Sequence, residues 1–85
     1  MPETKVGRVK EYFAKVGVAG IEITEGQLSV GDTIHIRGHT TDLTQRVDSM
    51  QIEHQGVEKA GPGHIIGIKV RERVRPNDQV FKESA

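Results

Sequence analysis

The sequence predicts an all-β fold, a small six- to seven-stranded antiparallel β-barrel. Ten glycines are spread along the 85 residues, and stretches of about five to ten residues lie between many of them, which is typical of strands rather than long helices. Between the glycines, apolar and polar side chains alternate with period two, as in strands with one buried face. Closure into a barrel would remove the unpaired edges of a small open sheet.

A chain of this length builds one hydrophobic core. We therefore expect a single β-barrel domain over residues 1–85, with an ordered core over about residues 4–82. The first strand is expected over about residues 5–15, with Val9 and Phe13 facing the core.

The next elements follow from glycine turns and from branched side chains on alternate positions. Ile21 and Ile23 flank a glutamate and should share the buried face of the second strand. Turns over residues 24–27 and 30–32 enclose a short apolar segment, because glycine in each can adopt a positive φ without steric cost. Ile34 and Ile36 then alternate with polar residues in a further strand.

The strand expected over about residues 44–54 has an irregular phase. In a regular pleat Val47 would lie on the face opposite to Met50 and Ile52. A β-bulge near residues 48–49 would bring all three inward.

The last third of the chain contains a turn and two strands. Residues 57–63 should form a tight connection containing proline, with a single helical turn over residues 56–60 as the alternative. The final strand should include Val80 and Phe81, with residues 83–85 frayed. Between these segments, three branched side chains should share one strand face: Ile66, Ile68 and Val70.

Composition limits the compartment and the partners. The chain has no cysteine, so it forms no disulfide, and a reducing, cytoplasmic location is expected. Neither a signal peptide nor an apolar run of roughly 20 residues is found, so no membrane partner is expected. Twelve basic and twelve acidic residues cancel, so any nucleic-acid site must be local.

Motifs for catalysis and cofactor binding are not found, so we expect no enzyme activity, no nucleotide and no cofactor. The glycine-rich segment over residues 60–64 precedes a strand, whereas a phosphate-binding loop precedes a helix. His35 and His39 would lie roughly 13 Å apart along a strand, too far to share a metal ion. No strand-to-helix elbow surrounds the serines, which are Ser29, Ser49 and Ser84.

One pattern suggests a nucleic-acid site. On an extended strand Val70 and Val74 would face inward, while four cations would form an outward stripe about 20 Å long that could meet phosphates. The alternative is a solvated face neutralised by Glu72 and nearby acids, or charges that protect an exposed edge from aggregation. The four cations are Lys69, Arg71, Arg73 and Arg75.

The order of motifs resembles the β-barrel second domain of translational GTPases such as elongation factor Tu. It is most similar to the small free-standing proteins called translation elongation factor-like. The GTP-binding domain of the full-length factors has no counterpart in this sequence, so the resemblance implies no GTP binding. The motifs are Val6-Gly7-Arg8-Val9, Ile21-Glu22-Ile23-Thr24-Glu25-Gly26, Leu28-Ser29-Val30-Gly31-Asp32-Thr33-Ile34, Val47-Asp48-Ser49-Met50-Gln51-Ile52, Val57-Glu58-Lys59-Ala60, Pro62-Gly63, Ile66-Gly67-Ile68 and Asp78-Gln79-Val80-Phe81.

The resemblance implies a non-catalytic binding module that associates with RNA, tRNA or the ribosome. A related barrel at the C-terminus of collagenase-like peptidases provides a second context. The alternative is therefore a protein-interaction module that docks onto a separately encoded enzyme, either a translational GTPase or a collagenase-like peptidase.

Overall fold

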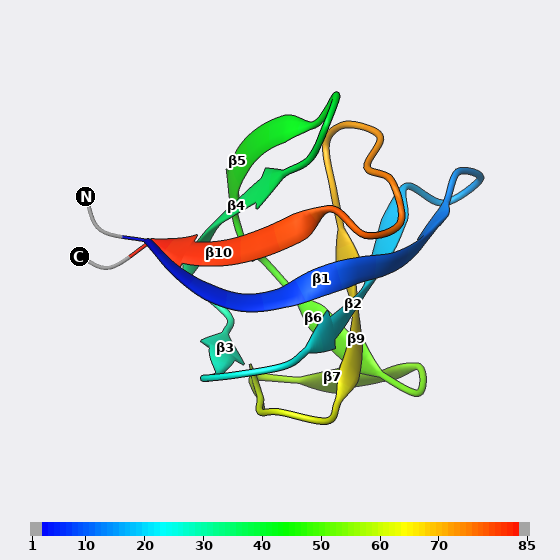
Figure 1. Cartoon of the computed structure of the whole chain (residues 1–85). Helices are drawn as coiled ribbons and strands as arrows, with labels where there is room; N and C mark the ends of the chain where they lie inside the picture. Colours follow the sequence, from blue (N-terminus) through cyan, green and yellow to red (C-terminus); the bar gives the residue numbers. More distant parts are fainter. Residues whose placement is uncertain (1–2, 84–85) are drawn as a thin grey trace.

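The computed structural model describes residues 3–83, and over these residues the regular elements are all strands (Figure 1). No helix in this range has the length and hydropathy that crossing a membrane requires. The strands are β1 (Glu3–Phe13), β2 (Val18–Ile23), β3 (Leu28–Ser29), β4 (Thr33–Arg37), β5 (Asp42–Arg46), β6 (Met50–Ile52), β7 (Gln55–Val57), β8 (Lys59–Ala60), β9 (Ile65–Lys69) and β10 (Gln79–Glu83).

Eight of the strands form one antiparallel sheet in the order β5-β4-β10-β1-β2-β9-β6-β7, and β3 pairs separately with β8. The all-β prediction is confirmed, but the prediction of a closed barrel is wrong. The sheet ends at β5 on one side and at β7 on the other, and these edges do not pair with each other. Instead, the Gln45 side chain of β5 bonds to the backbone of Lys69, at the end of β9, and of Arg71, just after it.

The core lies on one face of the sheet and follows the predicted alternation. The isoleucines on the expected inward positions are at most 1% exposed. They come from β2, β4 and β9, so the period-two pattern correctly identified the buried face of three strands. These residues are Ile21, Ile23, Ile34, Ile36, Ile66 and Ile68.

Phe13 does not face the core, contrary to the prediction. Its side chain is 47% exposed, whereas Val9 of the same strand is fully buried. The pairing of β1 with β2 shifts register between Val9 and Glu11. Because a register shift changes which residues face inward, Tyr12 packs against the core and Phe13 turns outward.

The segment expected as one bulged strand is divided into β5 and β6. Val47 and Met50 are both buried, as predicted, and Ile52 packs partly against the core. However, the backbone of Val47 bonds to the preceding turn, with Gly31 N donating to Val47 O and Val47 N donating to Asp32 O, each at 2.8 Å. The chain therefore leaves the sheet between the two strands, and no bulge is needed.

The ends of the predicted elements differ in two places. Residues 56–60 form parts of β7 and β8, so the helical turn offered as an alternative is wrong. Glu83, expected to fray, is the last residue of β10 and pairs with Glu3. The fraying expected for residues 84–85, which include Ser84, falls outside the described residues.

Candidate binding surfaces

The four predicted phosphate-binding cations do not share one extended strand. Lys69 is the last residue of β9, and the three arginines lie in the irregular segment that connects β9 to β10. All four residues are exposed, and the intervening Val70 and Val74 are buried as predicted. The expectation that one extended strand carries all four cations is therefore wrong, although the cations lie close together in the sequence.

Two buried polar side chains hold this segment out of the sheet. Gln45 donates from Nε2 to Lys69 O at 2.9 Å and accepts from Arg71 N at Oε1 at 3.0 Å. Asp78, only 5% exposed, accepts from Arg75 N at 2.9 Å. Since these side chains satisfy backbone groups that a strand would pair with its neighbour, the segment folds as a loop.

The cations of the loop have few partners among the described residues. The guanidinium of Arg73 lies 5.9 Å from the centre of the Tyr12 ring, a cation–π arrangement. Over residues 3–83 the ion pairs involve only Arg8 with Glu22 and His35 with Glu3 and Asp42. Glu72 therefore forms no direct ion pair with the arginines, and phosphate binding by these cations stays a prediction.

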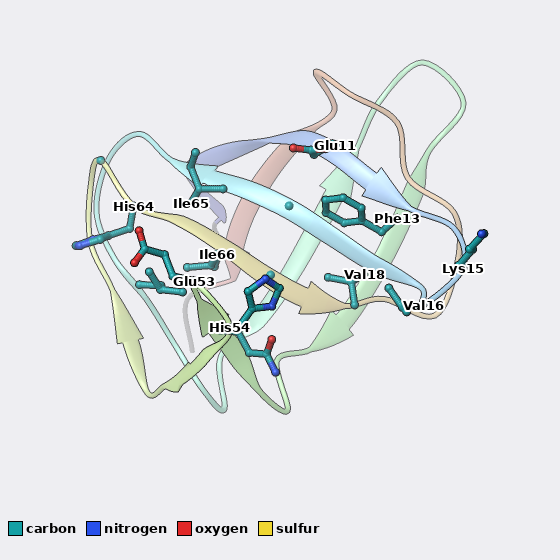
Figure 2. A pocket seen from close by; sticks show the side chains of 15 residues that line it. Glu11, Phe13, Lys15, Val16, Val18, Glu53, His54, His64, Ile65 and Ile66 are labelled. Carbon is teal, nitrogen blue, oxygen red and sulfur yellow. The ribbon is translucent and has the colours of Figure 1, made fainter.

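A larger surface feature is an apolar groove on the outer face of β1, β2, β9 and β6, with a volume of about 960 Å³ (Figure 2). Phe13, Val16 and Ile65 line it and are 47%, 60% and 46% exposed. Figure 2 shows Phe13 and Val18 toward one end and Ile65 and His64 toward the other. We define the groove by its lining residues: Glu11, Phe13, Lys15, Val16, Val18, Gly20, Gln51, Ile52, Glu53, His54, Gly63, His64, Ile65, Ile66 and Gly67.

Two glycines form the floor of this groove. Gly20 of β2 pairs with Gly67 of β9, and the row continues to Glu11 on β1 and Gln51 on β6. Neighbours of the glycines along each strand are core residues, so the glycines lie on the outer face. Gly20 is nevertheless buried, because side-chain atoms of Glu11 and Phe13 lie 3.3 and 3.8 Å from the position that its Cβ would take, and Gly67 is partly exposed.

Sequence reasoning missed the groove. Phe13 was assigned to the core, and Ile65 adjoins the buried Ile66, so neither stood out as exposed. The one available signal was the glycine within the alternating run of β9, because glycine in a strand often marks close approach of another group.

Within the described residues, the histidines are not arranged as ligands of a metal ion. Within the described part of the chain, no three histidine, aspartate or glutamate side chains gather where they could hold a metal ion. His35 is bound on both ring nitrogens by carboxylates, with Nδ1 2.6 Å from Glu3 Oε2 and Nε2 2.5 Å from Asp42 Oδ1. The hydrogen bond with Asp42 raises the pKa of His35, burial lowers it, and Glu3 raises it further.

Proteins similar to this chain in sequence are named collagenase and protease. The chain is 44% identical over 81 residues to a collagenase of Porphyromonas gingivalis, a match that covers 94% of this chain and 22% of that protein. It is also 44% identical over 78 residues to an uncharacterized protease of Methanocaldococcus jannaschii, covering 91% of this chain and 19% of that protein. The chain thus spans about a fifth of the length of these curated relatives. No family model matches the sequence.

Solved structures give the fold. The C-terminal domain of a chain described as a U32 peptidase of Geobacillus thermoleovorans superposes with a TM-score of 0.85 at 23% identity, covering 93% of this chain and 91% of that one. The selenomethionine variant of the same domain gives 0.83 at 22% identity, covering 89% and 95%. The fold is that of a U32 peptidase C-terminal domain.

The resemblance to a translation factor is therefore wrong. The matching relatives are named collagenase and protease, and the matching structures are U32 peptidase C-terminal domains, not translation factors. The motifs that supported the resemblance, such as Gly31-Asp32 and Pro62-Gly63, specify turns. Turn chemistry of this kind is shared by unrelated small β folds, so it identified the fold class but not the relatives.

Proposed function

We propose that this chain is a non-catalytic binding module that docks onto the catalytic part of a collagenase or U32-type peptidase. The observation that carries the proposal is the exposed apolar groove around Phe13, Val16 and Ile65. Contiguous apolar surface rimmed by polar groups is typical of protein-interaction sites. This function corresponds to the protein-interaction alternative predicted from the sequence, with a peptidase as the partner.

The groove has the composition of an interface. Its lining combines an aromatic ring with branched aliphatic side chains, and charged residues such as Glu11, Lys15 and Glu53 line it as well. Protein interfaces commonly have an apolar, aromatic-rich centre within a polar rim.

The length of the relatives supports a large protein as the partner. In the Porphyromonas gingivalis collagenase, the stretch similar to this chain is 22% of the protein. About four fifths of that collagenase lies outside the stretch that is similar to this chain. We assign the chemistry of proteolysis to that remainder and binding to the present fold.

The test is a pull-down with the purified 85-residue chain as bait, from nuclease-treated lysate of the cells that produce it, with captured proteins identified by mass spectrometry. We expect recovery of a U32-type peptidase chain. Ile65→Asp should abolish this recovery by placing a charge in the groove, because an unpaired charge is costly to bury. The matched control is Val30→Asp, since Val30 is similarly exposed, at 41%, but lies outside the groove.

Two results would overturn the proposal. One is that the wild-type bait recovers no U32-type peptidase chain. The other is that Ile65→Asp recovers the peptidase as efficiently as wild type and Val30→Asp do.

A further inference from the structure

We propose that the turn between β6 and β7, formed by Glu53 and His54, determines the specificity of the docking surface, and that Glu53 binds a lysine or arginine side chain of the partner. This inference rests on the proposed docking function and specifies the chemistry that the partner presents. Three observations support it: the backbone conformation of the turn, the residues that occupy it and its place in the groove.

The turn is a two-residue hairpin loop. Ile52 of β6 pairs with Gln55 of β7, so only Glu53 and His54 lie between the two strands. Their φ angles are 52° and 66°. Positive φ at both central residues is the mark of a type I′ turn, whose twist matches that of the flanking strands. Asparagine followed by glycine is strongly preferred in such turns.

Glutamate followed by histidine is an unusual pair for this conformation. A Cβ is disfavoured in the left-handed region, and glycine or asparagine tolerates that region better than glutamate does. The rest of the chain follows this preference, because the other residues of positive φ within residues 3–83 are all glycine or asparagine. They are Gly17, Gly26, Gly31, Gly63 and Asn77. The two exceptions are adjacent in one turn.

Contacts within the chain do not compensate for this strained conformation. Both side chains are exposed. Neither makes a hydrogen bond or an ion pair with another residue in the part of the chain that the structure describes. Residues other than glycine that are held in the left-handed region cluster at binding sites, where the strain is part of the function. We therefore assign the side chains of Glu53 and His54 to recognition.

The turn lies toward one end of the groove. Both Glu53 and His54 line the groove. Figure 2 shows Glu53 toward the end that holds His64 and Ile65, whereas Lys15 lies at the opposite end. Ile65 is 46% exposed. A partner that fills this end of the groove therefore meets apolar surface from Ile65 and a carboxylate from Glu53.

The carboxylate of Glu53 favours a cation. Docking removes water from the groove, and a carboxylate that leaves water without a partner is costly to bury. Among the described residues, Lys15 is the one lysine or arginine that lines the groove, and it lies at the other end. The compensating charge therefore has to come from the partner. A guanidinium or ammonium group supplies both the charge and N–H donors for charge-assisted hydrogen bonds.

The first test relieves the strain in the turn. Glu53→Asn combined with His54→Gly gives the pair that type I′ turns prefer. We expect amide hydrogen exchange in β6 and β7 to slow, and the affinity for the recovered U32-type peptidase to fall about tenfold or more. The control is Asn77→Gly, which also changes a residue of positive φ but lies outside the groove and should bind like wild type. Unchanged affinity or unchanged exchange in the double variant would overturn the inference.

The second test isolates the charge. Glu53→Gln keeps the length of the side chain and removes its charge, whereas Glu53→Lys reverses the charge. We expect binding to the peptidase to weaken about tenfold in Glu53→Gln and further in Glu53→Lys. The matched controls are Glu58→Gln and Glu58→Lys, because Glu58 is also exposed but does not line the groove. Full affinity in either Glu53 variant would exclude a cationic group of the partner at this position.

The third test needs no peptidase. Wild-type protein is titrated with N-acetyl-leucyl-arginine amide while amide resonances are followed by NMR, with N-acetyl-leucyl-glutamine amide as the uncharged reference. We expect saturable shifts at the amides of Glu53 and His54 with the arginine probe alone, and their loss in Glu53→Gln but not in Glu58→Gln. Shifts that spare the turn, or that the uncharged probe reproduces, would contradict the inference.

These tests separate the inference from the proposed function. If the arginine probe binds at the turn but no U32-type peptidase is recovered, the peptidase role fails and the cation site stands. If the peptidase is recovered but Glu53→Gln and the double variant bind it as tightly as wild type, docking stands and recognition by Glu53 fails.

Discussion

His35 is the residue whose charge depends most clearly on its surroundings. A neutral imidazole carries only one N–H, so both of its contacts, to Glu3 and Asp42, are hydrogen bonds only when the ring is protonated. The contacts join β4 to β1 and β5 on the outer face of the sheet. Because folding brings these carboxylates to the ring, the pKa of His35 in the folded state is raised above 6.5.

This raised pKa predicts a pH-dependent stability. The stabilisation is fully present below pH 6.5 and is lost as the pH rises through the higher folded-state pKa. The free energy of unfolding in urea should therefore fall for His35→Gln relative to wild type at about pH 5.5, and the difference should shrink by about pH 9. His39→Gln, at an exposed histidine, is the matched control for the substitution itself. A difference between wild type and His35→Gln that is constant with pH would refute the prediction.

Gly7 gives a second prediction at the scale of one residue. A Cβ there would lie 2.1 Å from Glu22 O and 3.2 Å from Ile23 Cα, both backbone atoms. Gly7→Ala should therefore force β1 and β2 apart and lower the free energy of unfolding by about 1–3 kcal/mol. In contrast, Gly56→Ala enters open space and should change it by less than about 0.5 kcal/mol. Urea unfolding of the two variants tests this, and equal stabilities would contradict it.

At the scale of the structural elements, the conformation of the loop between β9 and β10 depends on hydrogen bonds from Gln45. Gln45→Leu would remove both of its bonds, leaving Lys69 O and Arg71 N without these partners. We expect the free energy of unfolding to fall by about 1–3 kcal/mol and the Arg71 amide to exchange faster with solvent. Gln55→Leu, on the exposed edge strand β7, is the control. Hydrogen exchange at Arg71 that is unchanged in Gln45→Leu would show that the loop is held in another way.

The same loop shows what could be predicted from the sequence. Alternation along a strand is local, so the buried positions of Ile34, Ile36 and Ile66 were predicted correctly. Alternation also suggested a strand through Arg71 and Arg75, but a bond from the distant Gln45 and one from the nearby Asp78 hold that segment as a loop.

The cationic residues and the apolar groove also differ in how far each could be predicted from the sequence. Cationic residues can be identified in a sequence, so the four cations were noted there, but the strand expected to carry them ends at Lys69 and their binding role stays a prediction. The groove depends on which residue of β2 lies opposite Gly67, and on a register shift in β1 that turns Phe13 outward. Pairing register is set by the whole sheet, so the groove could not be predicted from local pattern.

At the scale of the whole molecule, the free energy of local opening should differ between the centre and the edges of the open sheet. The strands β10, β1 and β2 pair along both sides, whereas β7 is a three-residue edge strand, and β6 pairs with β9 at one residue position. Edge strands with few partners open locally without global unfolding. Amides of β6 and β7 should therefore exchange at least about tenfold faster than those of β1 and β2 in hydrogen-exchange NMR. Uniform exchange across the sheet would contradict this.

Docking should change this pattern of hydrogen exchange, because β6, which is expected to open locally, forms one wall of the groove. Gln51, Ile52 and His54 line the groove from β6 and the turn that follows it, whereas no residue of β4 or β5 does. A partner that binds the folded groove raises the free energy of opening there through mass action. On addition of the recovered U32-type peptidase, exchange in β6 and β7 should slow, while the locally opening amides of the other edge strand, β5, should change little. Slowing confined to β5 would place the partner on the opposite side of the sheet and refute docking in the groove.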